Sequence, residues 1–125
     1  MTITIAVVED NPSNMKLIVL ILQRAGYAVL EACDADCGLA IIRERQPDLV
    51  LMDMHIPGTD GMEATRVLKQ DTATRHIPVV ALTARAMEGD RETMLAAGCD
   101  GYVSKPIRYQ EVLALIEELT AGKQK

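Results

Sequence analysis

Side chains capable of chemistry follow four of the apolar segments in this sequence of 125 residues. Two adjacent carboxylates follow the first segment, and a third carboxylate follows the segment that ends near residue 52. A hydroxyl and an ammonium group follow the two apolar segments nearest the C-terminus. If these segments are parallel strands, the side chains converge at one edge of a sheet, where open α/β folds bind ligands. The residues are Glu9, Asp10, Asp53, Thr83 and Lys105.

This combination of side chains is typical of metal-assisted phosphoryl transfer. Three carboxylates in one crevice repel one another unless a cation lies among them, and oxygen ligands without His or Cys favour Mg²⁺ over Ca²⁺. We expect that Mn²⁺ can substitute for Mg²⁺. A lysine and a hydroxyl would bind the oxygens of the transferring phosphoryl group. The remaining carboxylate would be the nucleophile and would form an aspartyl phosphate.

The elements that must position these residues alternate regularly along the chain. Apolar runs such as 49–52 are nearly continuous, as is typical of strands that are covered on both faces. The alternation predicts an α/β fold, a doubly wound parallel sheet with helices on both faces. The predicted strands are 3–8, 27–32, 48–52, 77–82 and 101–104, and the predicted helices are 13–25, 34–46, 60–70, 87–97 and a last one around 112–119.

Capping residues mark several of the expected helix ends. Ser13 is predicted to begin the first helix, and Asp34 is predicted to cap the second. Asp60 followed by Glu63 resembles the capping box of the third helix. Gly98 is predicted to follow the last residue of the fourth helix.

Composition and length exclude several classes of protein. The length fits one domain. Thirteen basic and eighteen acidic residues give a net charge of −5, which argues against direct nucleic-acid binding. The longest aliphatic run, 17–22, is far shorter than the roughly 20 residues that span a membrane. Without a recognisable leader, we expect a cytoplasmic location and reduced thiols, at Cys33, Cys37 and Cys99.

The segments around the polar strand ends resemble the receiver domain of two-component response regulators. The resemblance covers essentially the whole chain, and four such segments at the family's spacing are highly specific. It implies a flavodoxin-like sheet with strand order 2-1-3-4-5, a receiver domain over 1–121, a short tail over 122–125 and no output domain. The matching segments are VVEDN (7–11), PDLVLMDMHIPG (47–58), IPVVALTA (77–84) and GYVSKP (101–106).

The resemblance implies a role in phosphorylation for several residues. Asp53 would be the phosphoacceptor, and Lys105 would pair with the phosphoryl group. The Thr83 hydroxyl and the backbone N–H of Ala84 would donate hydrogen bonds to phosphoryl oxygens. Tyr102 would be an aromatic switch that turns inward when Thr83 moves.

The same resemblance implies a set of metal ligands and a cis peptide bond. Asp10, Asp53 and the backbone carbonyl of His55 would bind Mg²⁺. Glu9 stands where many family members have an aspartate, and it would contribute directly or through a water molecule. The bond before Pro106 would be cis, because X–Pro bonds adopt this isomer at low cost, and it would place the preceding ammonium group.

These roles describe a signalling switch rather than an enzyme. The phosphoryl donor would be a sensor histidine kinase, a histidine phosphotransferase or a small acyl phosphate, and water would later hydrolyse the product. Phosphorylation would change a surface around residues 87–119, which would contact a downstream protein target. We expect a monomer that does not insert into membranes and acts in phosphorelay signalling, with control of cell division or development as one possibility.

Three other functions are compatible with parts of the pattern. A phosphatase of the haloacid dehalogenase type would need a second aspartate at the position of His55, and also a cap and a longer chain. A flavodoxin-like cofactor carrier would need a phosphate-binding loop after the first strand, but Glu9 and Asp10 lie there and would repel the phosphate. An unphosphorylated docking scaffold would not need an acceptor, a lysine and a hydroxyl. Each polar residue alone has an ordinary structural explanation, but their joint spacing favours the switch.

Overall fold

Five parallel strands form the centre of the molecule in a computed structural model that describes residues 2–54, 61–83, 92, 95–105 and 107–121. The strand order is β2-β1-β3-β4-β5, and every neighbouring pair is parallel. This order confirms the predicted doubly wound, flavodoxin-like fold. The strands are β1 (Thr4–Val8), β2 (Ala28–Ala32), β3 (Leu49–Asp53), β4 (Val79–Thr83) and β5 (Gly101–Ser104).

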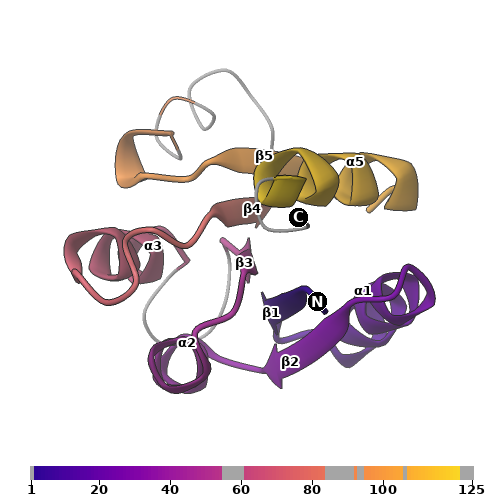
Figure 1. Ribbon diagram of the computed structural model, residues 1–125, viewed down its shortest axis with the longest axis horizontal. Coiled ribbons are helices and arrows are strands. Elements are labelled where there is room, and N and C mark those ends of the chain that lie inside the picture. Colours follow the sequence, from indigo (N-terminus) through magenta and orange to yellow (C-terminus); the bar gives the residue numbers. More distant parts are fainter. Residues whose placement is uncertain (1, 55–60, 84–91, 93–94, 106, 122–125) are drawn as a thin grey trace.

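Helices cover both faces of the sheet. Figure 1 shows α1 and α5 on one face and α2 and α3 on the other. Most of the helix predicted over 87–97 lies outside the described residues, but 95–97 are helical. Gly98 follows them with φ +106°, which confirms its predicted position after a helix end. The helices are α1 (Pro12–Arg24), α2 (Ala35–Arg45), α3 (Gly61–Gln70) and α5 (Tyr109–Thr120).

The sheet separates two apolar cores, because successive strand residues point to opposite faces. One core joins the odd-numbered residues of β1 to α1 and α5, as in the packing of Val7 with Ile18 and Ile116. The other joins the even-numbered residues to α2 and α3, as in the packing of Val8 with Ile42. The central strands are therefore buried on both faces, as their continuous apolar sequences predicted.

The first helix begins at Pro12, one residue before Ser13, which was the predicted start. The Asn11 side chain is the N-cap and accepts hydrogen bonds from the backbone N–H groups of Ser13, at 2.9 Å, and Asn14, at 3.1 Å. Pro12 is favoured in this first turn because it has no N–H to leave unsatisfied. The capping role thus belongs to Asn11, and the exposed Asp10 before it is not the N-cap of α1.

The ends of α2 match the prediction more closely. Asp34 is the N-cap and accepts a hydrogen bond of 2.8 Å from the backbone N–H of Cys37. Gln46, with φ 49°, ends the helix in a left-handed conformation just before Pro47. The capping box predicted for the next helix cannot be followed, because Asp60 lies outside the described residues.

Two further expectations concern the state of the cysteines and the presence of a membrane-spanning helix. Cys33 and Cys37 are exposed, Cys99 is buried, and all three are free thiols, as predicted. In the described part of the chain, no helix combines the length and apolar character that a membrane crossing requires.

Candidate functional site

The structure brings the predicted polar residues to the carboxyl-end edge of the sheet. Asp53 is the last residue of β3, and Thr83 is the last residue of β4. Glu9 directly follows β1, and Lys105 directly follows β5. Because β1, β3, β4 and β5 are consecutive parallel neighbours, these four positions line one edge. The prediction that residues distant in sequence meet here is confirmed for Glu9, Asp53 and Lys105, which are in direct contact.

Lys105 is the centre of the hydrogen-bonded contacts at this edge. Its ammonium group donates to both oxygens of Glu9, at 3.2 and 3.4 Å, and to Oδ2 of Asp53 at 3.2 Å. Glu9 is 1% exposed and Asp53 is 2% exposed. Burying two carboxylates requires compensation by a cation or hydrogen bonds, and Lys105 supplies both.

A third carboxylate gives this edge an excess of negative charge. Oxygen atoms of Glu9, Asp10 and Asp53 all lie within 4.8 Å of one another. Lys105 offsets part of their charge, so the cluster remains electronegative. A hollow of about 290 Å³ borders Glu9 and Asp10. An all-oxygen donor set of this charge fits a hard divalent cation such as Mg²⁺ better than a softer metal.

Burial and neighbouring groups shift the pKa values of two of these side chains. Burial raises the pKa of Glu9 to about 7, and a hydrogen bond with Asp53 acts in the same direction, against the effect of Asn14. Burial alone would lower the pKa of Lys105, but the charges of Asp53 and Glu9 outweigh it and the pKa is raised. Without a metal, burial therefore favours the protonated form of Glu9 more than water would, while Lys105 stays charged.

Thr83 and Tyr102 occupy neighbouring strands. Thr83 is 3% exposed, and its backbone carbonyl accepts a hydrogen bond of 2.7 Å from the N–H of Lys105. Tyr102 is half-buried on β5 and packs against the core on the α2 and α3 side. The predicted roles of His55, Ala84 and Pro106 fall on positions outside the described residues.

Two residues at the site were not assigned a role from the sequence. Asn14 donates a 2.8 Å hydrogen bond to Oε1 of Glu9 from the first turn of α1. Gly61 begins α3, and a Cβ there would overlap the backbone carbonyl oxygen of Asp53 and lie 2.7 Å from Cα of Met54. The only sequence signals were a polar residue one turn into a helix and a glycine at a helix start.

Comparison with known proteins agrees with this arrangement. Residues 5–117 match the family of the response regulator receiver domain. The polar-differentiation response regulator DivK of Brucella ovis is 42% identical over 117 residues, which cover 94% of this chain and 95% of DivK.

Two solved structures extend the comparison. The receiver domain of the sensor histidine kinase PA1611 from Pseudomonas aeruginosa PAO1, with a magnesium ion in its active-site cleft, has a TM-score of 0.90. It is 34% identical, with 97% of this chain and 99% of that chain covered. A CheY-like receiver domain protein from Methanospirillum hungatei has a TM-score of 0.89 at 26% identity, with 99% and 98% covered. The chain therefore belongs to the response regulator receiver domain family.

Proposed function

We propose that Asp53 accepts a phosphoryl group in a Mg²⁺-dependent reaction and that the chain is a phosphorylation-controlled switch. The observation that carries this proposal is the contact between the buried Asp53 and Lys105 at 3.2 Å, beside Glu9 and Asp10. A carboxylate with one oxygen held by an ammonium group, at the edge of an acidic cluster, combines a nucleophile with charge stabilisation for a phosphoryl group.

The reaction follows from these positions. An oxygen of Asp53 attacks the phosphorus of a phosphohistidine, the new P–O bond forms, and the P–N bond breaks with its electron pair passing to the imidazole nitrogen. Lys105 then moves from the free carboxylate to a phosphoryl oxygen. Mg²⁺, when held by Glu9, Asp10 and Asp53, would neutralise charge on the phosphoryl oxygens. Hydrolysis by water later restores the carboxylate.

Phosphorylation would then be transmitted through Thr83 and Tyr102. The backbone link between Thr83 and Lys105 couples the two neighbouring strand ends. A phosphoryl group on Asp53 would draw the Thr83 hydroxyl toward it, and Tyr102 would respond by turning inward. The contacts that change would lie around residues 87–119. Family membership also supports roles for three positions outside the described residues. The backbone carbonyl of His55 would bind Mg²⁺, the N–H of Ala84 would donate to a phosphoryl oxygen, and the bond before Pro106 would be cis.

The partners follow from the same chemistry. We propose a sensor histidine kinase or a histidine phosphotransferase as donor and a downstream protein as target, without direct nucleic-acid contact. The similarity to DivK, named for polar differentiation, supports control of cell polarity or division. In this proposal the chain is a cytoplasmic, monomeric, single-domain regulator rather than an enzyme, with the receiver domain over 1–121 and a tail over 122–125.

Intact-mass measurement after incubation with acetyl phosphate tests the phosphoacceptor. We expect one phosphoryl adduct with Mg²⁺ or Mn²⁺ and none with a chelator. Asp53→Asn should abolish the adduct, whereas the matched control Asp36→Asn, at an exposed position on α2, should keep it. No adduct from acetyl phosphate or from a purified histidine kinase would contradict the proposal and favour an unphosphorylated docking scaffold.

A further inference from the structure

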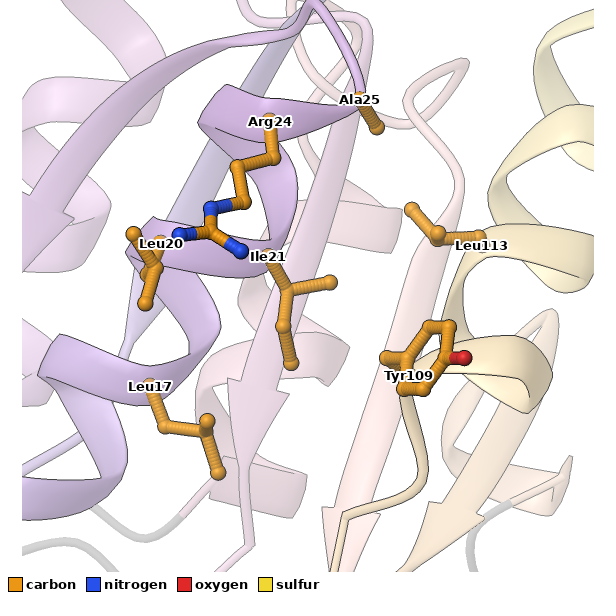
Figure 2. A pocket seen from close by; sticks show the side chains of 7 residues that line it. All are labelled: Leu17, Leu20, Ile21, Arg24, Ala25, Tyr109 and Leu113. Atoms are coloured by element: carbon orange, nitrogen blue, oxygen red, sulfur yellow. The ribbon is translucent and has the colours of Figure 1, made fainter.

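The helix α1 takes part in two separate features of the molecule. Its later turns form one wall of a groove of about 550 Å³, and the start of α5 forms the other wall (Figure 2). The described residues that line this α1–α5 groove are Leu17, Leu20, Ile21, Arg24, Ala25, Tyr109 and Leu113. The first turn of α1 lies instead at the carboxyl-end edge of the sheet, where Asn14 contacts Glu9. This contact lies outside the groove and needs a separate explanation.

The position of the Glu9 carboxylate depends on its hydrogen bonds. Glutamate has one more rotatable side-chain bond than aspartate, so its carboxylate loses more freedom when it is held in one place. The backbone of Glu9 is fixed by the 3.0 Å hydrogen bond from its N–H to the carbonyl of Ala32, at the end of β2. The side chain is buried, and Lys105 and Asn14 both donate to its carboxylate. These two donors therefore hold the carboxylate in place.

The two donors hold the carboxylate in different ways. The ammonium group of Lys105 lies 3.2 Å from Oε1 and 3.4 Å from Oε2, so it distinguishes little between them, and it also donates to Asp53. Among the hydrogen bonds of the described residues, Asn14 donates to Oε1 and not to Oε2, at 2.8 Å, which is the shortest of these contacts. Asn14 therefore fixes the rotation of the carboxylate and leaves Oε2 as the less strongly held oxygen.

Asn14 is itself held in place by the cap of α1. Its backbone N–H donates to Oδ1 of the N-cap residue Asn11 at 3.1 Å, and the N–H of Met15 donates to the carbonyl of Asn11 at 2.9 Å. The Asn14 side chain is short and half-buried. An ionised carboxylate only accepts hydrogen bonds, so the amide nitrogen of Asn14 must face Glu9. Asn14 thus presents a donor from a rigid element, as do the groups that orient metal ligands in other proteins.

We propose that Asn14 is a positioning residue of the cation site, which holds Oε1 of Glu9 and so leaves Oε2 for a divalent cation among Glu9, Asp10 and Asp53. Asn14 has this role only if Mg²⁺ binds these carboxylates, so the assignment rests on the proposed function. Mg²⁺ requires a more exact ligand geometry than Ca²⁺, whose coordination is larger and more flexible. Loss of the amide should therefore weaken Mg²⁺ binding more than Ca²⁺ binding. A role of Asn14 in folding alone would not separate the two cations.

Methyl ¹H–¹³C NMR titrations with Mg²⁺ and Ca²⁺, on the unphosphorylated protein at constant ionic strength, test this role. The methyl group of Met15 reports binding, because Met15 lines the hollow that borders Glu9 and Asp10. At about pH 9, well above the Glu9 pKa of about 7, the carboxylate is ionised in every variant that retains it. Asn14→Ala should weaken Mg²⁺ binding about tenfold and Ca²⁺ binding less than about threefold. The control Ser13→Ala, at an exposed position in the same turn, should change neither affinity.

A double-mutant cycle with Glu9→Asp shows whether Asn14 acts through Glu9. The shorter aspartate places its carboxylate farther from Asn14, so Asn14→Ala in this background should change the Mg²⁺ affinity less than about twofold. Equal losses for the two cations, no loss in Asn14→Ala, or an undiminished loss in the Glu9→Asp background would overturn the positioning role and leave the proposed function intact. A wild-type protein that binds no Mg²⁺ would overturn both.

Discussion

The carboxyl-end edge of the sheet and the α1–α5 groove differ in the side chains that they bury. The edge buries charged groups, whereas the groove leaves apolar groups exposed. At the sheet edge, Glu9 and Asp53 are buried charges held by Lys105. In the groove, Leu17 and Leu20 are apolar side chains left accessible to water. In the described part of the chain, no buried polar side-chain atom lacks a hydrogen-bond partner.

This difference reflects the separate requirements of chemical reaction and of protein binding. Chemistry at the sheet edge needs groups whose positions are fixed before the reacting molecule arrives, so its polar atoms are buried and paired. Binding of another protein needs surface that is still to be buried, so its apolar atoms remain outside the core. Variants at the two regions should therefore differ in how strongly they change the stability of the free protein.

The largest expected effect comes from Gly61→Ala at the sheet edge. The new Cβ would overlap the backbone carbonyl of Asp53, and the backbone cannot yield cheaply, so the free energy of unfolding should fall by about 3 kcal/mol. Urea unfolding measures this loss. Gly26→Ala is the control, because its Cβ meets nothing within 4 Å although its φ of +93° is unfavourable. Unchanged stability in Gly61→Ala would show that close approach to Asp53 does not require a glycine at this position.

The next effect is a pH dependence set by Glu9. Its pKa is about 7 in the folded protein, against 4.5 for a glutamate free in water. Between these two pH values the folded protein therefore keeps a proton on Glu9 that the unfolded chain has lost. The stability of the metal-free protein should therefore fall as pH rises from about 5 to 8, by at most about 3 kcal/mol. The raised pKa of Lys105 adds stability that is lost only in the alkaline range, and it does not contribute to this window.

Urea unfolding across this pH range, with and without Mg²⁺, measures that dependence. Glu9→Gln should flatten the curve, and Glu31→Gln, at an exposed carboxylate on β2, should not. Mg²⁺ should reduce the fall, because it binds the deprotonated cluster. A wild-type curve that rises over the same window would contradict the burial of an electronegative cluster.

A smaller effect is expected for Asn14→Ala. The variant removes the hydrogen bond to Oε1 of Glu9, which favours the charged carboxylate. The pKa of Glu9 should rise further, and at pH 8 the free energy of unfolding should fall by about 1 kcal/mol. Carboxyl ¹³C NMR reports the pKa directly. Ser13→Ala, in the same turn, is the control, and an unchanged Glu9 pKa in Asn14→Ala would assign the amide a role in folding alone.

The smallest effect is expected in the groove. Leu20→Ala should lower the free energy of unfolding by less than about 1 kcal/mol, because nearly half of the side chain is already in water. Leu22→Ala, two residues along the same helix but fully buried, should cost about 3 kcal/mol. Thermal or urea unfolding compares the two. Similar losses would mean that Leu20 stabilises the free fold and is not reserved for a partner.

The pattern of the sequence was sufficient to predict the parallel α/β fold and the residues of the sheet edge. The apolar runs ended at Glu9, Asp53 and Thr83, and parallel strands bring such ends together whatever lies between them. The family resemblance added the order of the strands. The fold class and the strand ends depend on local pattern, which a single sequence records.

What the sequence could not supply depends on distances between elements. The contact of Asn14 with Glu9 and the close approach of Gly61 to Asp53 need the separation of helix and strand. The groove is another example, because the helix predicted over 13–25 did not show that Leu20 faces a depression. The raised pKa of Glu9 likewise follows from burial, which composition does not give.

The ion pair between Lys105 and Glu9 also has a consequence for the folding of the chain. It joins residues 96 positions apart, one after the first strand and one after the last. We expect this contact to form late, because chain closure over such a separation is slow compared with local helix formation. A nascent or truncated chain without β5 lacks the ammonium group at its acidic edge. Competence for phosphorylation would thus be acquired only when the last strand has docked, so that incomplete molecules do not enter the signalling pool.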